Sequence, residues 1–267
     1  MDKNQFGKIS KLQIRAGKTH DNTVLKDVYF TSPFKVMEPF KEKDGSIRVM
    51  ILSASAGIME GDRQEISVFV EKGAELELLS QSYEKIHKMK NGCAKRKSDI
   101  VVEEKACFCY QPQPCIPFRD SAFENHTTVR LKDRSSKFYF NEILTCGRYA
   151  KEERFDYRFY HSIVEIYRES RLIYRDNTRY EPEKFDMEEI GMYESFSHLL
   201  NIFLSGTGMQ DDFEKQIQQL MNGMDEVQGG MTKLMDGDWA IRAFGRRAQT
   251  LEQLSTNIEN YWRRSNN

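Results

Sequence analysis

The segment LSASAGIMEGDRQEISVFVEKGAELELLSQSYEKI, residues 52–86, decides the fold that we expect for this chain. It opens with a loop of small residues, in which Gly57 and Gly61 mark positions where a side chain would not fit. Apolar and polar residues then alternate over residues 65–70 and 75–80, on either side of a turn that contains glycine. This alternation predicts two β-strands joined as a hairpin.

The strand and turn of residues 68–74 recur along the chain at intervals of about thirty residues, a spacing typical of stacked repeats. Residues 100–106 are the clearest copy, and residues 128–134 and 164–170 are weaker copies. One hairpin alone would expose its apolar face to water, whereas stacked hairpins bury these faces against one another. We therefore predict a mainly β body of layered hairpins over residues 1–205, resembling a β-helix or solenoid, with a sandwich as the alternative.

The pattern changes in residues 206–267, where we predict a small α+β portion that packs on the β body as part of one structural unit. Just before it, residues 199–204 are short and apolar enough for a buried strand, although their spacing also fits a helix. We favour the strand, and we expect Gly206 and Gly208 to end it.

Two helices and a hairpin are expected within this C-terminal portion. Asp211 or Asp212 can cap the first helix, and Asn222-Gly223 ends it. A hairpin then turns at Asp236-Gly237. The last helix is expected to start at Thr250, where Gln253 completes a capping box.

Composition narrows the possible classes of function. The chain has 267 residues and a formal net charge of -1, so no excess of positive charge favours a nucleic acid or an anionic membrane as partner. Its first residues are polar and no apolar run is long enough to span a bilayer, so we expect neither a signal peptide nor a membrane segment. Five cysteines, an odd number, favour reduced thiols and a cytoplasmic location over a disulfide framework.

The sequence contains no recognisable catalytic motif. It has no P-loop, no GxSxG elbow and no HExxH pair, and the glycines of residues 57–61 lead into a strand rather than a helix. From the residues alone, a binding or scaffold protein is therefore a better interpretation than an enzyme.

Four side chains are candidate ligands. Cys107 and Cys109 share one face of a predicted strand and can bind a soft metal ion, but the sequence lacks a second pair of ligands at a suitable spacing. Buried apolar packing explains them better. Asp62 can form an internal ion pair with Arg63 or serve a function. Glu142, in an apolar strand, can point outward or act inside.

Five segments are similar, in the same order, to motifs of one known family. They are residues 53–63, 80–86, 111–118, 141–148 and 238–244. The first resembles a Pro-Gly-Gly-hydrophobic-hydrophobic-x-Gly-Asp motif, with Ala56 in place of the first glycine. The second resembles a Thr/Ser-Gln-x-x-x-Lys motif and the fourth a Glu-Ile-x-x-x-Gly-Arg motif. Together they resemble the UreD family of urease accessory proteins, called UreH in some organisms.

This resemblance implies a β-helix-like body with a small helical portion, and a chaperone for urease activation that is not an enzyme. The implied partners are apo-urease, a UreF-type helical protein and, through it, a UreG-type GTPase. The matching loop and motif residues are Gly57, Gly61, Arg63, Ser80, Lys85, Gly147 and Arg148.

The resemblance also implies a transient cargo, Ni²⁺, and no tightly bound cofactor. The ion passes toward a urease site in which a carbamylated lysine bridges two nickel ions. If the path is internal, Asp62 and Glu142 are the motif carboxylates that would line it. Carboxylates hold a hydrated divalent ion weakly enough to release it. Two other classes stay open, a β-solenoid enzyme acting on carbohydrate and a metal-binding protein that uses Cys107 and Cys109.

Overall fold

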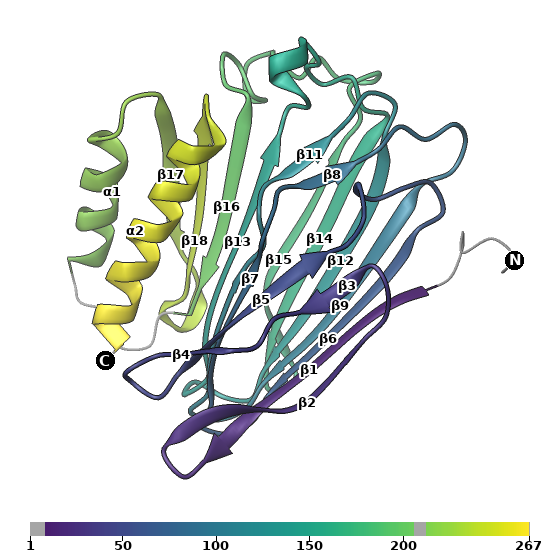
Figure 1. Cartoon of the computed structure of the whole chain (residues 1–267). Coiled ribbons are helices and arrows are strands. Elements are labelled where there is room, and N and C mark those ends of the chain that lie inside the picture. Colours follow the sequence, from purple (N-terminus) through teal and green to yellow (C-terminus); the bar gives the residue numbers. More distant parts are fainter. Residues whose placement is uncertain (1–8, 206–211, 267) are drawn as a thin grey trace, which may run out of the picture.

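Two β-sheets face each other across an apolar interior, and two helices lie against the outer face of one sheet (Figure 1). The computed structural model of the protein describes residues 9–205 and 212–266. Strands dominate this part of the chain, and its two α-helices follow the β body in sequence. The predicted fold class, mainly β with a small helical portion, is therefore confirmed.

In the described residues the first sheet has seven strands. In spatial order they are β15 (Arg171–Tyr180), β14 (Phe159–Arg168), β12 (Ala122–Leu131), β9 (Ala94–Val102), β6 (Arg63–Val70), β1 (Ile9–Thr19) and β2 (Asn22–Phe30). The second sheet has eleven, namely β17 (Val227–Lys233), β18 (Trp239–Gly245), β16 (His198–Leu204), β13 (Lys137–Thr145), β10 (Cys107–Gln111), β7 (Glu75–Ser80), β5 (Ile47–Ser53) and β3 (Phe34–Val36), with β4 (Phe40–Lys41), β8 (Glu84–Ile86) and β11 (Cys115–Pro117) beside them.

The strands that flank each repeated turn lie in opposite sheets, so the predicted hairpin pairing is wrong for three of the four repeats. β6 pairs in parallel with β1 and β9, whereas β7, the next strand along the chain, pairs in parallel with β5 and β10. The pairs β9–β10 and β12–β13 are divided in the same way, and β14–β15 is an antiparallel hairpin as predicted. Alternation shows which face of a strand is buried, but not whether the chain turns back beside that strand or crosses to the opposite sheet.

The repeats do stack on one another. Val68 pairs with Ile100 and Ile100 with Val129 in the first sheet, and Phe108 pairs with Phe138 in the second. Antiparallel strands flank both parallel stacks, β2 and β15 in the first sheet and β16 and β3 in the second. The solenoid form is therefore not confirmed, and two open sheets describe the body.

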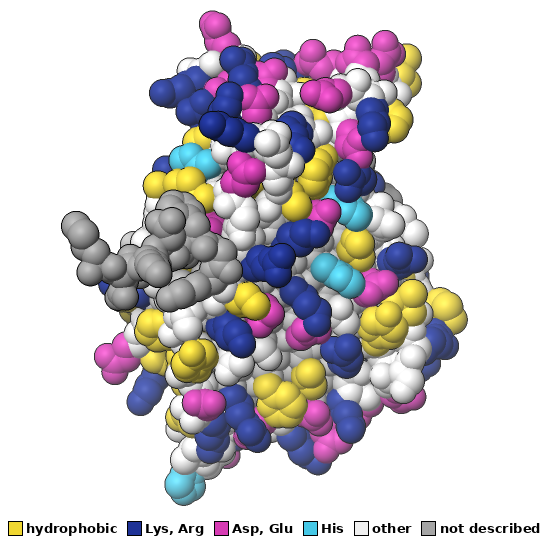
Figure 2. All heavy atoms as spheres, turned by 90° about the vertical axis from the view of Figure 1, so that its right-hand side faces the viewer, with side chains coloured by type: hydrophobic (Ala, Val, Ile, Leu, Met, Phe, Trp, Pro, Cys, Tyr) yellow, Lys and Arg dark blue, Asp and Glu magenta, His cyan; other side chains and the backbone are white. Residues whose placement is uncertain are grey.

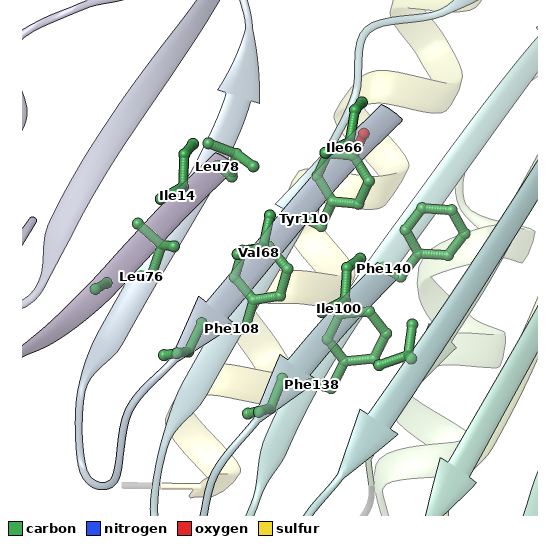
Figure 3. Packing of buried hydrophobic residues seen from close by; sticks show 14 of the residues in the cluster. Ile14, Ile66, Val68, Leu76, Leu78, Ile100, Phe108, Tyr110, Phe138 and Phe140 are labelled. Carbon is green, nitrogen blue, oxygen red and sulfur yellow. The ribbon is translucent and has the colours of Figure 1, made fainter. Parts of the chain in front are cut away.

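Side chains of both sheets fill the interior (Figure 3). Ile66, Val68 and Ile100 of the first sheet share one cluster with aromatic side chains of the second sheet. The rings of Phe108 and Phe138 stack with their centroids 5.8 Å apart. Such rings bury large apolar areas and fix the spacing of the strands that carry them.

The outer face of the seven-stranded sheet is polar. Lys95 Nζ lies 2.6 Å from Glu124 Oε2, and Lys97 Nζ lies 2.9 Å from Asp99 Oδ2. Figure 2 shows basic and acidic side chains interspersed over this side of the molecule. Charges of both signs therefore lie next to one another on the described part of this face.

The C-terminal strands extend the second sheet. The strand expected at residues 199–204 is confirmed as part of β16, which pairs with β13 and β18. The hairpin around Asp236-Gly237 is confirmed as β17 and β18. A short 3₁₀ turn, Met235–Gly237, joins these two strands. The boundary expected at residue 205 adjoins residues outside the described part, which include Gly206 and Gly208, and it stays a prediction.

The two helices cover this end of the second sheet. α1 (Phe213–Asn222) ends before Gly223 as predicted, but Asp212 makes no capping bond with its side chain, and Asp211 lies outside the described residues. α2 (Ala248–Asn266) begins before Thr250, so the predicted capping box is wrong. The Leu251 amide already donates to the Arg247 carbonyl at 3.4 Å, which places Thr250 inside the first turn. Neither helix in the described part of the chain is both long and apolar enough to cross a bilayer.

Candidate functional site

One buried row of polar side chains crosses the seven-stranded sheet. Gln64 on β6, Arg96 on β9, Asn125 on β12 and Ser162 on β14 occupy neighbouring positions in the register of four parallel strands. They lie on the faces that point into the apolar interior, because side chains two positions apart on a strand share a face. We call these four residues the polar layer.

Two carboxylates of the second sheet complete the site. Arg96 donates from Nη1 to Glu84 Oε2 at 2.7 Å and from Nη2 to the other Glu84 oxygen. Gln64 Oε1 accepts two further bonds from Arg96, at 2.9 Å from Nε and 2.6 Å from Nη2. The guanidinium also lies 5.6 Å from the centre of the Phe123 ring. Arg96 is therefore fixed in place from three directions.

Glu142, on β13, accepts hydrogen bonds from three side chains of the first sheet. Its Oε1 accepts from the Tyr160 hydroxyl at 2.9 Å, from Ser162 Oγ at 3.0 Å and from Asn125 Nδ2 at 3.3 Å. Burial raises the pKa of the Glu142 carboxyl, and the three donors only partly offset this. The carboxylate of Glu142 is thus held inside the sandwich by neutral donors rather than by a cation.

Two small cavities open beside these groups. The outer cavity has a volume of about 90 Å³ and is lined by Gly57, Ser80 and Lys85 among other residues. The inner cavity has a volume of about 20 Å³, room for roughly one water molecule, and Glu142 lies in its wall. The two cavities share a wall made of Glu84, Arg96, Tyr110, Pro112 and Gln113.

A wider groove of about 680 Å³ runs beside α2. Pro112 and Gln113 lie in the walls of this groove and of both cavities, so the segment between β10 and β11 separates the three spaces. Gln111 Nε2 donates to Glu259 Oε2 of α2 at 2.8 Å, which attaches this segment to the helix. This short segment, together with Ile143 of β13, therefore lies between the groove and the inner cavity.

The Cys115 thiol and the Tyr160 hydroxyl, which both line the inner cavity, are weak metal ligands while they are protonated. Burial raises the pKa of the Cys115 thiol and of the Tyr160 hydroxyl well above their usual values, so both stay protonated near neutral pH. Burial lowers the pKa of Arg96, but the Glu84 carboxylate outweighs this and leaves the pKa raised. A cation in the inner cavity would face oxygen ligands and one fixed positive charge.

The structure separates the two predicted carboxylates. Glu142 lines the inner cavity, whereas Asp62 lies outside both cavity walls. Asp62 Oδ2 accepts from the Met59 amide at 2.8 Å and closes the turn that precedes β6. No ion pair joins Asp62 to Arg63 in the part of the chain that the structure describes, and Arg63 is exposed.

The motif glycines shape two loops. Gly57 has a φ of +142°, and a Cβ there would lie 2.4 Å from the Lys85 carbonyl oxygen. Gly147 has a φ of +132°, and a Cβ there would lie 2.8 Å from the Glu153 carbonyl oxygen. Next to it, Arg148 Nε donates to Glu153 Oε2 at 2.8 Å. Both glycines thus permit close backbone contacts, whereas Gly61, with φ +83°, serves the turn alone.

The cysteines do not gather into a metal site. All five are free, and Cys109 is buried in the cluster beneath the helices, where burial raises its pKa well above the usual value. Across the described ranges, no three or more His, Cys, Asp and Glu side chains are grouped so as to hold a metal ion. The thiol-based metal protein has no structural support here.

The fold and the site define a mainly β protein with polar cavities inside a sandwich and two helices on one outer face. The chain belongs to the UreD urease accessory protein family, whose model matches residues 8–266. Over 259 residues it is 39% identical to urease accessory protein UreD of Acetivibrio thermocellus, covering 97% of this chain and 98% of that protein. It is 31% identical over 259 residues to UreH of Helicobacter pylori strain P12, covering 97% and 96% of the two chains. The family resemblance seen in the sequence is confirmed.

Proposed function

We propose that this protein acts in urease maturation, in the cytoplasm, as a non-catalytic accessory protein through which Ni²⁺ reaches apo-urease. Family membership supports the role in maturation. One observation carries the proposed path: a half-buried carboxylate, Glu142, borders a cavity that shares a wall with a second cavity. Buried apolar side chains of both sheets, among them Tyr110 and Phe140 of the cavity wall, form the cluster beside these cavities.

The chemistry of the inner cavity suits passage rather than storage. Glu142 supplies one carboxylate, and the protonated Cys115 thiol is a poor metal ligand, because it is the thiolate that binds metal ions. A cavity of about 20 Å³ cannot hold an ion with a full shell of waters. The ion would exchange part of its shell for oxygen atoms of the protein and would leave again without a change in any covalent bond.

We propose the family's partners for this chain as well. A UreF-type helical protein would bridge it to a UreG-type GTPase, and apo-urease would receive the ion. Asp62 is proposed as a ligand near one end of the path, since it closes the loop whose earlier residues line the outer cavity. No tightly bound cofactor is part of the proposal.

The test is urease activation in cells that carry the urease genes and the other accessory genes. Glu142→Gln keeps the size and shape of the side chain but removes its charge, and we expect a loss of at least tenfold in urease activity and in bound nickel. Glu124→Gln is the matched control, because Glu124 precedes Asn125 on β12 but points to the outer face. Full activation by Glu142→Gln would end the proposed path.

Asp62→Ala forms the second arm of this test. We expect it to abolish activation while the protein remains folded, because the single bond from the Met59 amide to the Asp62 carboxylate contributes about 1.5–3 kcal/mol, a fraction of the roughly 5–15 kcal/mol that stabilises a domain. Full activation by this variant would remove Asp62 from the path and leave Glu142 in it.

A further inference from the structure

Arg96 is the one cationic side chain that lines the inner cavity in the described residues, and it also lines the outer cavity. Its side chain is 10% exposed, and its guanidinium is held by Glu84, Gln64 and the Phe123 ring. An arginine stays positively charged at any physiological pH. A path for a cation therefore passes a fixed positive charge at the wall between the two cavities.

Stability alone does not explain this ion pair. Replacing a buried ion pair by apolar side chains of similar volume is often neutral or stabilising. The surrounding core is rich in such side chains, including Phe123 and Phe140. Glu142 lies in the wall of the same inner cavity as the pair, and it has no cation of its own among the contacts described above. These facts point to a role for Arg96 in setting the affinity of the cavity for a cation.

Glu84 and Glu142 both lie in the wall of the inner cavity. Two carboxylates with nearby amide and hydroxyl oxygens form the ligand set that divalent cations prefer, and the number of charged ligands tunes the affinity. Arg96 occupies both oxygens of Glu84 and neutralises its charge. Only Glu142 is then left to attract a cation.

We infer that Arg96 limits how long a divalent cation is retained in the inner cavity, because its guanidinium occupies Glu84 and prevents two carboxylates from trapping the ion. The inference rests on the proposed function, since it concerns the same cavity and the same cargo. Arg96 acts through Glu84 and is a positioning residue. Without it, the passage becomes a binding site.

The experiment is equilibrium dialysis of the purified full-length protein against Ni²⁺, with no urease present. Arg96→Gln should bind one Ni²⁺ per chain at least tenfold more tightly than the unchanged protein. The double variant Arg96→Gln/Glu84→Gln should return to the affinity of the unchanged protein, because the second carboxylate is then gone. Lys95→Gln is the matched control, since Lys95 precedes Arg96 but pairs with Glu124 on the outer face.

Two results would overturn the inference. One is a folded Arg96→Gln variant that binds Ni²⁺ no more tightly than the unchanged protein, and the other is tight binding that persists in the double variant. If Arg96→Gln does not fold, Arg96→Lys takes its place. A lysine ammonium group contacts Glu84 at one point, whereas the arginine guanidinium contacts both carboxylate oxygens. The affinity of Arg96→Lys for Ni²⁺ should therefore rise about threefold. An unchanged affinity would contradict the inference.

This experiment is separate from the test of the path itself. Full activation by Glu142→Gln would show that nickel takes another route, but it would not alter the dialysis result. A path confirmed by Glu142→Gln together with unchanged affinity in Arg96→Gln would leave the path standing and remove only the role of Arg96.

Discussion

The Tyr160 hydroxyl on β14 donates a 2.9 Å hydrogen bond to the Glu142 carboxylate on β13, and this bond links the two sheets beside the inner cavity. Ser162, two residues along the same strand, donates to the same carboxylate at 3.0 Å. The first sheet therefore fixes the direction in which Glu142 points.

Glu142→Gln should change how stability depends on pH. Burial raises the folded-state pKa of Glu142 above its unfolded value, so the folded state binds more protons between these two values. The contribution of Glu142 to the free energy of unfolding is then highest below the unfolded-state pKa. It falls as pH rises through the folded-state pKa, by about 1.4 kcal/mol for each pH unit that separates the two pKa values. Urea denaturation at pH 4.5 and pH 8 should show a smaller loss across this interval in Glu142→Gln. An equal loss in both proteins would contradict the raised pKa.

Tyr160→Phe should weaken activation without abolishing the fold. The variant removes one donor to Glu142, and the Tyr160 hydrogen bond is among the effects that lower the pKa of Glu142, so this pKa should rise further. A hydrogen bond to a charged group contributes about 1.5–3 kcal/mol, which sets the expected loss of stability at pH 8. Urea denaturation measures that loss, and the urease activation assay measures the function. Tyr167→Phe, on the same strand, is the control.

The alignment of the repeats in the sequence differs by one residue from the strand register in the structure, so the alignment does not bring the residues of this site together. Comparing the repeats position by position sets Thr128 against Ile100, but the structure pairs Thr128 with Asp99 and Ile100 with Val129. A shift of one residue moves a side chain to the other face of a strand. A comparison of the repeats therefore does not reveal the polar layer, although each of its residues lies four positions before a buried aliphatic residue of its own strand: Val68, Ile100, Val129 or Ile166.

The fold class and the positions of many strands along the chain can be predicted because alternation and turn residues are local signals. Strand pairing could not, since Val70 and Glu75 flank a turn that is equally compatible with a hairpin and with a crossing between sheets. Glu142 was identified as a candidate by its apolar surroundings and its motif. Arg96 was not, because its partner Glu84 lies on a short strand of the other sheet and only tertiary structure brings them together.

Gly57→Ala should destabilise the loop that lines the outer cavity. The φ of +142° is one that alanine rarely adopts, and the added Cβ would lie 2.4 Å from the Lys85 carbonyl oxygen. Strain of this kind costs about 1–3 kcal/mol. Gly230→Ala is the control, because a Cβ at Gly230 meets nothing within 4 Å. Thermal unfolding should show a clear loss for the first variant and a much smaller change for the second, and equal losses would contradict the steric argument.

Asp238→Asn should be strongly destabilising. Arg168 donates to both Asp238 oxygens, at 2.8 and 2.9 Å, and this pair joins β14 to the start of β18. In Asp238→Asn the side chain carries no charge to balance the buried guanidinium, and its amide oxygen replaces only one of the two acceptors, so the free energy of unfolding should fall by about 3–5 kcal/mol. Asp236→Asn, at a more exposed position, should cost less. Replacing both partners, as in Arg168→Met/Asp238→Leu, should recover part of the loss.

Native-state thiol reactivity should divide the cysteines into two groups. Cys93 and Cys107 are half-buried, whereas Cys109, Cys115 and Cys146 are buried. Burial raises the pKa of Cys146 to about 11 and those of Cys109 and Cys115 well above the usual value, so little reactive thiolate forms near pH 7.5. Titration with a chromogenic disulfide should therefore show at most two fast thiols in the native protein and five in denaturant. Fast reaction of Cys115, identified by mass spectrometry, would show that reagent and water enter the inner cavity freely, and would mean that the segment between β10 and β11 opens in solution.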